Sequence, residues 1–430
     1  MGKKLRAPLC FSLFFAARLA AADFGTLRSE LAELALREDG SASPENLAVL
    51  ARIRAIAAEA TAVAERGEED ADEAWGFLED AYRRRERNVA MEAALALIGS
   101  RRAEGIRRVL RSAREADAAV RRQALRTLAL SDRGAADAFE ELRTALESEK
   151  DLESALALVE LASRAGTLEA ARALVARSTS APSELREAIA RALAEFSSLE
   201  VATWLSSGAF LESRHPSRLW VAARVAASRK DASARPRLED LLEHEDLSVA
   251  AEALAALSSV GPEESLERIA EIAKKEGAHP ELAARAAVVL ASVDREAGTK
   301  ALLDLAARAE WTCREAAARA LPALPEEERA FRMCLGLLQD PNREVRASAF
   351  AALRSFRRKE AIRAAIGLLS PFGGSDPDRA LAYLEWATGR RLGKDRAAWL
   401  AWWKEAEPGF RFPDPNPIGS DRPGTETKGR

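Results

Sequence analysis

The chain has 430 residues, and its composition is typical of a helical protein. Charged residues make up 31% and aromatic residues 6%, and the good helix formers alanine, leucine, arginine and glutamate dominate. The 65 Lys and Arg against 68 Asp and Glu give a net charge of −3, which excludes an overall attraction to nucleic acid or to an anionic membrane. Any electrostatic function must therefore be local.

The first 22 residues are typical of an export signal. Basic residues precede an apolar run over 7–17, and three alanines at 20–22 form a small-residue cleavage site. The run has about half of the ~20 residues that span a bilayer, and no later stretch is apolar enough to do so. We therefore expect an exported protein, periplasmic or extracellular, that begins at Asp23 after cleavage and has no membrane span.

Residues 23–85 are predicted to form a divergent N-terminal cap. The segment 24–66 contains two amphipathic helices that are split at 39–41 by Asp-Gly-Ser. An acidic run over 68–73 then leads into a further helix that contains Trp75.

The Arg-rich region, residues 83–126, carries the strongest local charge. Its thirteen arginines face five acids, for a local net charge of +8. Guanidinium groups bind carboxylates and phosphates, so the region is suited to an acidic partner protein, an anionic polymer or nucleic acid. The alternative is a set of solvated helix faces with ion pairs between units. The arginines predicted to contact a partner are Arg107, Arg108, Arg121, Arg122 and Arg126.

A short phrase recurs along the chain with a period near 32 residues. It is clearest at 120–128, VRRQALRTL, and it returns at 345–353, VRASAFAAL. We call its first apolar residue the anchor; apolar residues or alanine follow at about +4, +7 and +8, as on a helix buried along one side. The nine anchors are Val89, Val120, Leu152, Leu185, Leu219, Val249, Leu282, Cys313 and Val345.

Helix-starting residues precede the anchors, so each anchor is predicted to lie in the second helix of a hairpin. Asp117, Asp246 and Asn342, for example, have side chains that suit an N-terminal cap. A unit of this size cannot bury its own apolar face and must stack on its neighbours. The sequence therefore predicts an all-α, right-handed superhelix of about ten helical hairpins over residues 86–390.

These repeats resemble the HEAT-repeat family, including the shorter bacterial HEAT-like repeats, over roughly residues 85–390. In that family an Asp or Pro near the turn and an Arg after the anchor commonly build a polar ladder between units. Three arginines stand at this position here: Arg121, Arg186 and Arg346. The ladder is expected to lapse where other residues replace the arginine: Trp220, Ala250 and Ala283.

Histidine and cysteine patterns give little support to catalysis or to a metal site. His215, His244 and His279 each lie three to five residues before an anchor, without HxxxH or CxxC spacing. Helices pack about 8–10 Å apart, whereas zinc needs each nitrogen within about 2 Å, so turn and cap roles are favoured. Some HEAT-like proteins are bilin lyases, but the resemblance covers only the repeat. We expect no enzyme, metal, cofactor or small-molecule substrate, with a lyase or enzyme accessory protein as the alternative.

Cys313 and Cys334 lie about ten residues to either side of a turn near Leu324. Antiparallel helices place them at the same height, so a disulfide is sterically conceivable in an exported protein. The favoured alternative is a pair of small, buried apolar residues.

Four of the eight tryptophans are clustered near the C-terminus: Trp386, Trp399, Trp402 and Trp403. This run is similar to a closing motif found after HEAT-like repeats in some exported bacterial proteins. Residues 391–407 are therefore predicted to be a capping helix over the apolar end of the array, with ligand binding by exposed aromatics as the alternative. The segment 408–430 is rich in proline, glycine and polar residues and is predicted to be disordered.

Together these features predict an exported, non-catalytic scaffold that binds a protein partner of unknown identity. The concave face of the second helices and the Arg-rich region are the expected contact surfaces, and Trp220 is the candidate aromatic contact. Export argues against nucleic acid as the physiological ligand.

Overall fold

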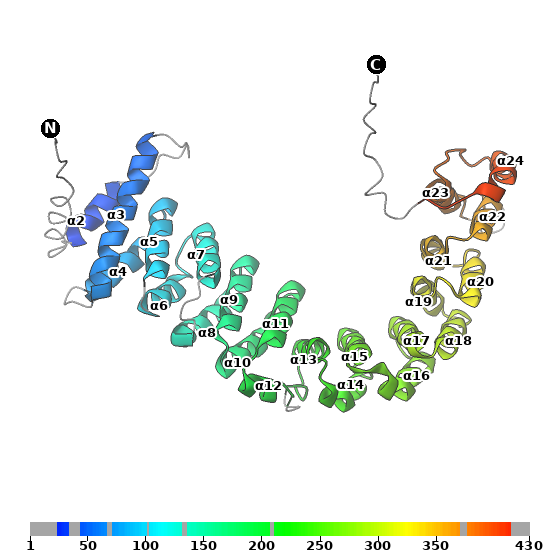
Figure 1. Ribbon diagram of the computed structural model, residues 1–430, viewed down its shortest axis with the longest axis horizontal. Helices are drawn as coiled ribbons and strands as arrows, with labels where there is room; N and C mark the ends of the chain where they lie inside the picture. Colours follow the sequence, from blue (N-terminus) through cyan, green and yellow to red (C-terminus); the bar gives the residue numbers. More distant parts are fainter. Residues whose placement is uncertain are drawn as a thin grey trace, which may run out of the picture. The chain divides into compact units, whose positions relative to one another are not determined.

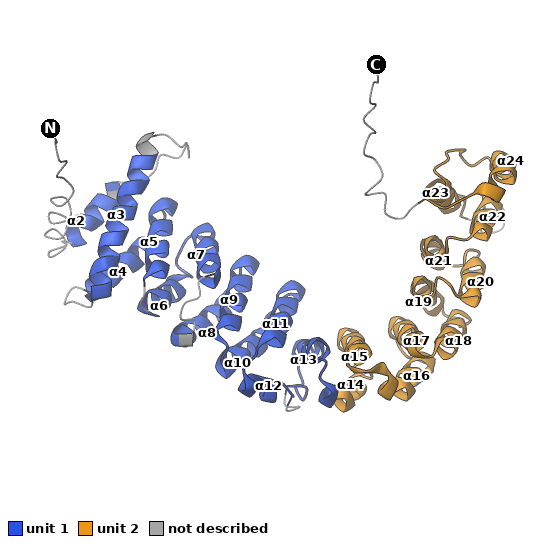
Figure 2. Cartoon of the chain, in the orientation of Figure 1, with its two compact units in different colours: residues 1–234 blue, residues 235–430 orange. Residues whose placement is uncertain are grey.

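The computed structural model describes most of the chain, and all regular secondary structure in the described residues is helical (Figure 1). The described ranges are 24–33, 44–66, 71–100, 103–130, 136–206, 210–369 and 376–413. The predicted signal peptide, the predicted break at 39–41 and residues 414–430 lie outside them. The chain divides into two compact units, residues 1–234 and 235–430 (Figure 2).

The helices of the first unit alternate between two layers (Figure 1). From α4 onward, even-numbered helices pack on even-numbered ones, and odd-numbered helices pack on odd-numbered ones. Its helices are α2 (Phe24–Glu33), α3 (Pro44–Arg66), α4 (Ala71–Tyr82), α5 (Arg87–Gly99), α6 (Ala103–Ser112), α7 (Ala118–Leu130), α8 (Phe139–Ser148), α9 (Leu152–Ala165), α10 (Leu168–Arg177), α11 (Ser183–Glu195), α12 (Leu199–Ser206) and α13 (Pro216–Arg229).

The second unit repeats this arrangement, with odd-numbered helices again forming one layer. We call the odd-numbered helices of each unit its second-helix layer. The helices are α14 (Arg235–Leu241), α15 (Leu247–Val260), α16 (Leu266–Lys274), α17 (Pro280–Val293), α18 (Arg295–Ala306), α19 (Trp311–Ala320), α20 (Glu328–Leu337), α21 (Arg343–Phe356), α22 (Lys359–Gly367), α23 (Pro377–Thr388) and α24 (Arg396–Ala406).

The anchors lie in the second-helix layer, as the repeat phrase predicts, and all but one of them are buried. The exception is Leu152, which is half-buried. Anchors such as Val120 and Val345 stand three residues after the N-cap, and in α9 the N-cap is Asp151. The equivalent residue is Ser154, which is fully buried and donates its hydroxyl to Asp151 Oδ2 at 2.8 Å. The predicted anchor Leu152 is therefore two residues too early.

Small residues set the approach of one hairpin to the next. A Cβ on Gly298 of α18 would collide with the backbone and side chain of Ala291 in α17. A Cβ on Gly105 of α6 would collide in the same way with Leu97 and Ser100, at the end of α5. Only glycine allows these helices to lie so close.

The C-terminal aromatic residues pack on one another around α24. Trp399 and Trp403 are buried, and Trp399 Nε1 donates to Gly393 O at 2.7 Å. The ring of Phe410 lies 5.1 Å from that of Trp403, and Lys359 Nζ donates to Glu407 O at 2.5 Å. The described chain continues to residue 413, and the rings of Phe410 and Phe412 lie 5.1 Å apart next to α24.

Candidate partner-binding surface

Several second helices begin at side chains that accept hydrogen bonds from backbone N–H groups. His215 and His279 are N-caps, and their Nδ1 atoms accept from Ser217 N and Glu281 N, both at 3.3 Å. His244 Nδ1 accepts from the N–H of the N-cap Asp246 at 3.0 Å. The histidines therefore have the turn and cap roles that their spacing favours. Among the described residues, no cluster of His, Cys, Asp or Glu could hold a metal ion.

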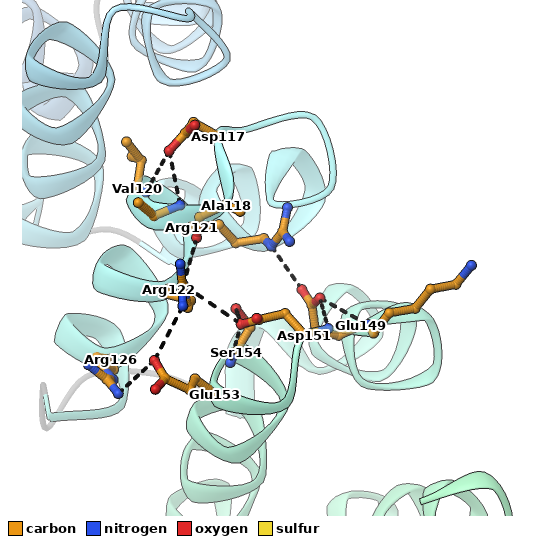
Figure 3. Close-up of polar contacts among 12 residues, drawn as sticks. Asp117, Ala118, Val120, Arg121, Arg122, Arg126, Glu149, Asp151, Glu153 and Ser154 are labelled. Carbon is orange, nitrogen blue, oxygen red and sulfur yellow. Dashed lines mark hydrogen bonds and ion pairs between the residues drawn. The ribbon is translucent and has the colours of Figure 1, made fainter.

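An arginine directly after the anchor links successive repeats in the second-helix layer. In α7, Arg121 donates to Ala113 O and Ala116 O in its own turn and pairs with Glu149 of the next turn at 3.1 Å (Figure 3). Glu149 also accepts from the N–H of the N-cap Asp151 at 2.9 Å. We call this arrangement a rung. It consists of an arginine directly after the anchor and a carboxylate two residues before the next N-cap.

A second complete rung lies between α19 and α21. Arg314 Nη1 donates to Arg308 O and Ala309 O in its own turn. Its Nε and Nη2 donate to the carboxylate of Asp340 at 2.6 and 3.1 Å. Burial alone would raise the pKa of Asp340, but hydrogen bonds from Arg314 and from Asn342 N outweigh burial and lower it. The rung is thus built around an ionised carboxylate.

The remaining ladder arginines have different environments. Arg346 donates to Asp340 O at 2.9 Å and Pro341 O at 3.1 Å, within its own turn. Arg186 of α11 lies over the ring of Trp220, 5.5 Å from its centroid, and Arg224 lies 5.8 Å from the same centroid. Trp220 is half-buried on α13, so it keeps an accessible face on the second-helix layer.

The Arg-rich region is largely neutralised by carboxylates of neighbouring helices. Arg122 lies 3.7 Å from Glu153, and Arg126 donates to the same carboxylate at 2.9 Å (Figure 3). Arg107 lies 3.6 Å from Glu104 and also donates to Asp137 O. Arg121, Arg122 and Arg126 thus make ion pairs between consecutive repeats, whereas the ion pair of Arg107 lies within its own helix.

The most buried part of this region is a carboxylate network on the other layer. Glu79 of α4 is 6% exposed and accepts from Arg83, Arg108 and Ser112 at 2.7, 2.9 and 2.6 Å. Arg108 also donates to Glu104 at 2.9 Å. The net charge of +8 over residues 83–126 does not include Glu79, Glu149 and Glu153, which lie outside that window.

A groove of ≈ 410 Å³ lies over the second-helix layer of the second unit, on α15, α17 and α19. Its lining is dominated by small or apolar side chains, which are Ala251, Leu254, Ala255, Ser258, Ala284, Val288, Val289, Ala316, Ala320 and Ala323. Its charged margin consists of Glu281, which pairs with Arg285 at 3.1 Å and with Arg319 at 3.4 Å. The groove therefore combines an apolar floor with charges of both signs.

Solved structures of the karyopherin Kap121p have a similar arrangement of helices. The complexes with Pho4p and with Ste12p each give a TM-score of 0.51 at 13% identity, covering 81% and 84% of this chain and 46% and 44% of that one. The RanGTP complex gives 0.50 at 13% identity, covering 81% and 45%. The fold is that of a HEAT-repeat α-solenoid.

At this identity the likeness concerns the fold alone, and the chain spans less than half the length of Kap121p. No family model matches the sequence, and neither does any curated protein. None of the described helices of the solenoid is both long and apolar enough to cross a membrane.

The two cysteines among the described residues are both buried, and both are free thiols in the structure. Cys334 Sγ donates to Ala349 O at 3.3 Å. Burial raises the pKa of the Cys334 thiol to about 12, so this thiol stays protonated at neutral pH. The pair thus fills space in the core of the hairpins.

One rung residue of the solenoid was missed in the sequence. Arg314 follows the anchor Cys313, just as Arg121 follows Val120, but it was not predicted to be a ladder arginine. Its position after the anchor was a sufficient signal.

Proposed function

We propose that this protein is a non-catalytic scaffold that binds a segment of a partner protein along its second-helix layer. The observation that carries this proposal is the groove over α15, α17 and α19. Successive repeats each contribute one helix to the groove, so an elongated ligand would contact several repeats at once. An α-solenoid of similar fold, Kap121p, has been solved in complex with proteins, which supports the same use of the fold here.

The lining of the groove suits a polypeptide segment. Ala255, Ala284 and Ala320 have no bulk beyond Cβ, so a bound chain can approach the helices closely. Val288 and Val289 are half-buried and supply apolar contact area. Glu281 and Arg319 at the margin can orient a polar or charged side chain of the ligand. We assign the groove to an apolar segment with flanking charges.

A substitution that fills the groove tests this assignment. Ala255 is exposed at the middle of α15, so Ala255→Trp would occupy the groove without overpacking the core. The matched control is Ala401→Trp, at an exposed position in the middle of α24 and outside the groove. Random peptides displayed on phage would be selected against the full chain. Selected peptides should bind the control but not Ala255→Trp; equal binding to both variants would contradict the assignment.

The N-terminal sequence adds that the scaffold acts outside the cytoplasm. This part of the proposal depends on the basic start, the apolar run and the alanines at 20–22. Expression in a bacterial host followed by mass spectrometry of the periplasmic fraction tests it. The expected product begins at Asp23, whereas an uncleaved chain confined to the cytoplasm would contradict export.

A further inference from the structure

The rung of Arg186 contains the arginine but not the carboxylate. In the complete rungs, Glu149 and Asp340 each stand two residues before the N-cap of the next second helix. The corresponding residue for Arg186 is Ser213, which stands two residues before the N-cap His215. Ser213 has the same backbone role, because its hydroxyl accepts from His215 N at 3.2 Å, as Glu149 and Asp340 accept from the N-cap residues after them.

Arg186 is consequently without the partner that the other two rung arginines have. Among the described residues its polar contact is with Ser217 Oγ at 3.4 Å, and no carboxylate pairs with it. Its Nε is buried and has no hydrogen-bond partner. One face of the guanidinium is covered by Trp220, which leaves the edge that carries the N–H groups for a ligand.

The surroundings of Arg186 are suited to an anionic group. Arg224, one helical turn beyond Trp220, lies on the same indole ring and adds a second positive charge. Arg186, Ser213 and Trp220 are each half-buried, so a ligand can reach them from solvent while it is partly shielded from water. Partial shielding strengthens a charge-assisted hydrogen bond.

We propose that Arg186, together with Trp220 and Arg224, binds a carboxylate of an acidic segment of the partner protein, which completes the rung from outside. This inference rests on the proposed function, because it assumes a partner protein and adds a contact for an acidic segment of it on the second-helix layer of the first unit. The two Nη atoms at the end of the arginine side chain can donate parallel hydrogen bonds to a carboxylate. The ring of Trp220 offers an apolar surface to the methylene groups of a glutamate.

Restoring the missing carboxylate within the chain tests this inference. Ser213→Glu places an acid where Glu149 stands in its own rung, and Ser213→Gln is the uncharged control of the same size. The probe is a short, fluorescein-labelled polyglutamate peptide, and its binding to the full chain is measured by fluorescence anisotropy. We expect Ser213→Glu to weaken binding on the order of tenfold, and Ser213→Gln to retain it, because only the glutamate competes for Arg186.

A stability measurement accompanies the binding measurement. The thermal midpoint of Ser213→Glu should exceed that of Ser213→Gln, since the new carboxylate pairs with Arg186 without any ligand. Arg186→Gln should lose polyglutamate binding to the same extent as Ser213→Glu. A matched polyglutamine peptide should not bind to the wild type. Inorganic phosphate that displaced polyglutamate at equal charge would reassign the site to phosphate groups and overturn the proposal.

The inference fails if polyglutamate binds the wild type and the Arg186→Gln variant equally, or if the wild type does not bind it. Ala255→Trp separates this outcome from the proposed function, because it blocks the groove in the other unit. Loss of the phage-selected peptides in Ala255→Trp with unchanged polyglutamate binding is the expected pattern. If polyglutamate binding were lost in Ala255→Trp and not in Arg186→Gln, the binding site of the acidic segment would be the groove.

Discussion

The guanidinium of Arg314 holds the carboxylate of Asp340 in a two-point contact, with Nε 2.6 Å from Oδ2 and Nη2 3.1 Å from Oδ1. Asp340 is 7% exposed, so an unpaired carboxylate there would be poorly solvated. This contact ties α19 to the turn before α21.

Removal of Arg314 should therefore destabilise the second unit. Arg314→Ala leaves Asp340 buried without its cation, and we expect a loss of about 1.5–3 kcal/mol in the free energy of unfolding. Arg332→Ala is the control, because Arg332 pairs with Glu328 on an exposed helix face and should change stability little. Urea unfolding followed by circular dichroism measures both variants. Similar midpoints for the two would show that the rung does not stabilise the fold.

Acid should weaken the turns that aspartates build. The hydrogen bond from Ser248 Oγ lowers the pKa of Asp246, and hydrogen bonds from Arg314 and Asn342 N lower that of Asp340 against the effect of burial. A lowered pKa means that the folded state favours the ionised form. This stability is complete above the ordinary value of about 3.9 and is lost as the pH falls below it, through the lower folded pKa values.

Thermal midpoints measured across the acid range would show this dependence. The midpoint should be nearly constant above about pH 5 and fall below about pH 4. Asp340→Asn should have a lower midpoint at neutral pH and a smaller fall in acid, because it has one fewer carboxyl group with a lowered pKa. A wild-type midpoint unchanged down to about pH 3 would rule out this linkage.

A methyl group at Gly298 should separate two hairpins. Gly298→Ala would drive a Cβ into Ala291, and overpacking of this kind costs about 1–3 kcal/mol. Gly336 is the matched control: it is an exposed helical glycine in the same unit with no atom near its Cβ position. Gly336→Ala should be neutral or slightly stabilising because alanine favours the helix. The comparison needs only thermal unfolding, and an unaffected Gly298→Ala would show that α18 can shift freely.

The C-terminal tryptophans should differ sharply in their contribution to stability. Trp403 is 3% exposed and packs against Phe410, so Trp403→Ala should cost about 3–5 kcal/mol. Trp386 is 43% exposed and contacts Tyr383 and Arg354, so Trp386→Ala should cost clearly less. Chemical denaturation of both variants measures the difference. Equal losses would mean that the buried ring has no special role in closing the array.

The repeat phrase was sufficient to place the hairpins, because burial along one side of a helix leaves a periodic pattern. It failed at Leu152, since the structurally equivalent Ser154 is polar and satisfies its buried hydroxyl locally through Asp151. The turn and cap roles of the histidines were predictable from their places three to five residues before the anchors.

The candidate site was less predictable than the fold. Arg121 and Arg108 were recognised as cations, but Glu149 and Glu79, which pair with them, come from other units of the stack. The groove could not be predicted residue by residue, because alanines such as Ala255 and Ala320 look like ordinary helix formers in a sequence. Their significance depends on which helices become neighbours.

Gly105 and Gly298 occupy the same position in the repeat pattern, because they follow the anchors Val89 and Leu282 at equal distances in the sequence. At these two junctions the spacing between consecutive hairpins is therefore set by the two adjoining helices and not by distant parts of the chain. A gene duplication that copied one whole unit would carry its own junction with it. The solenoid could lengthen by single units in evolution while its existing helices kept their neighbours.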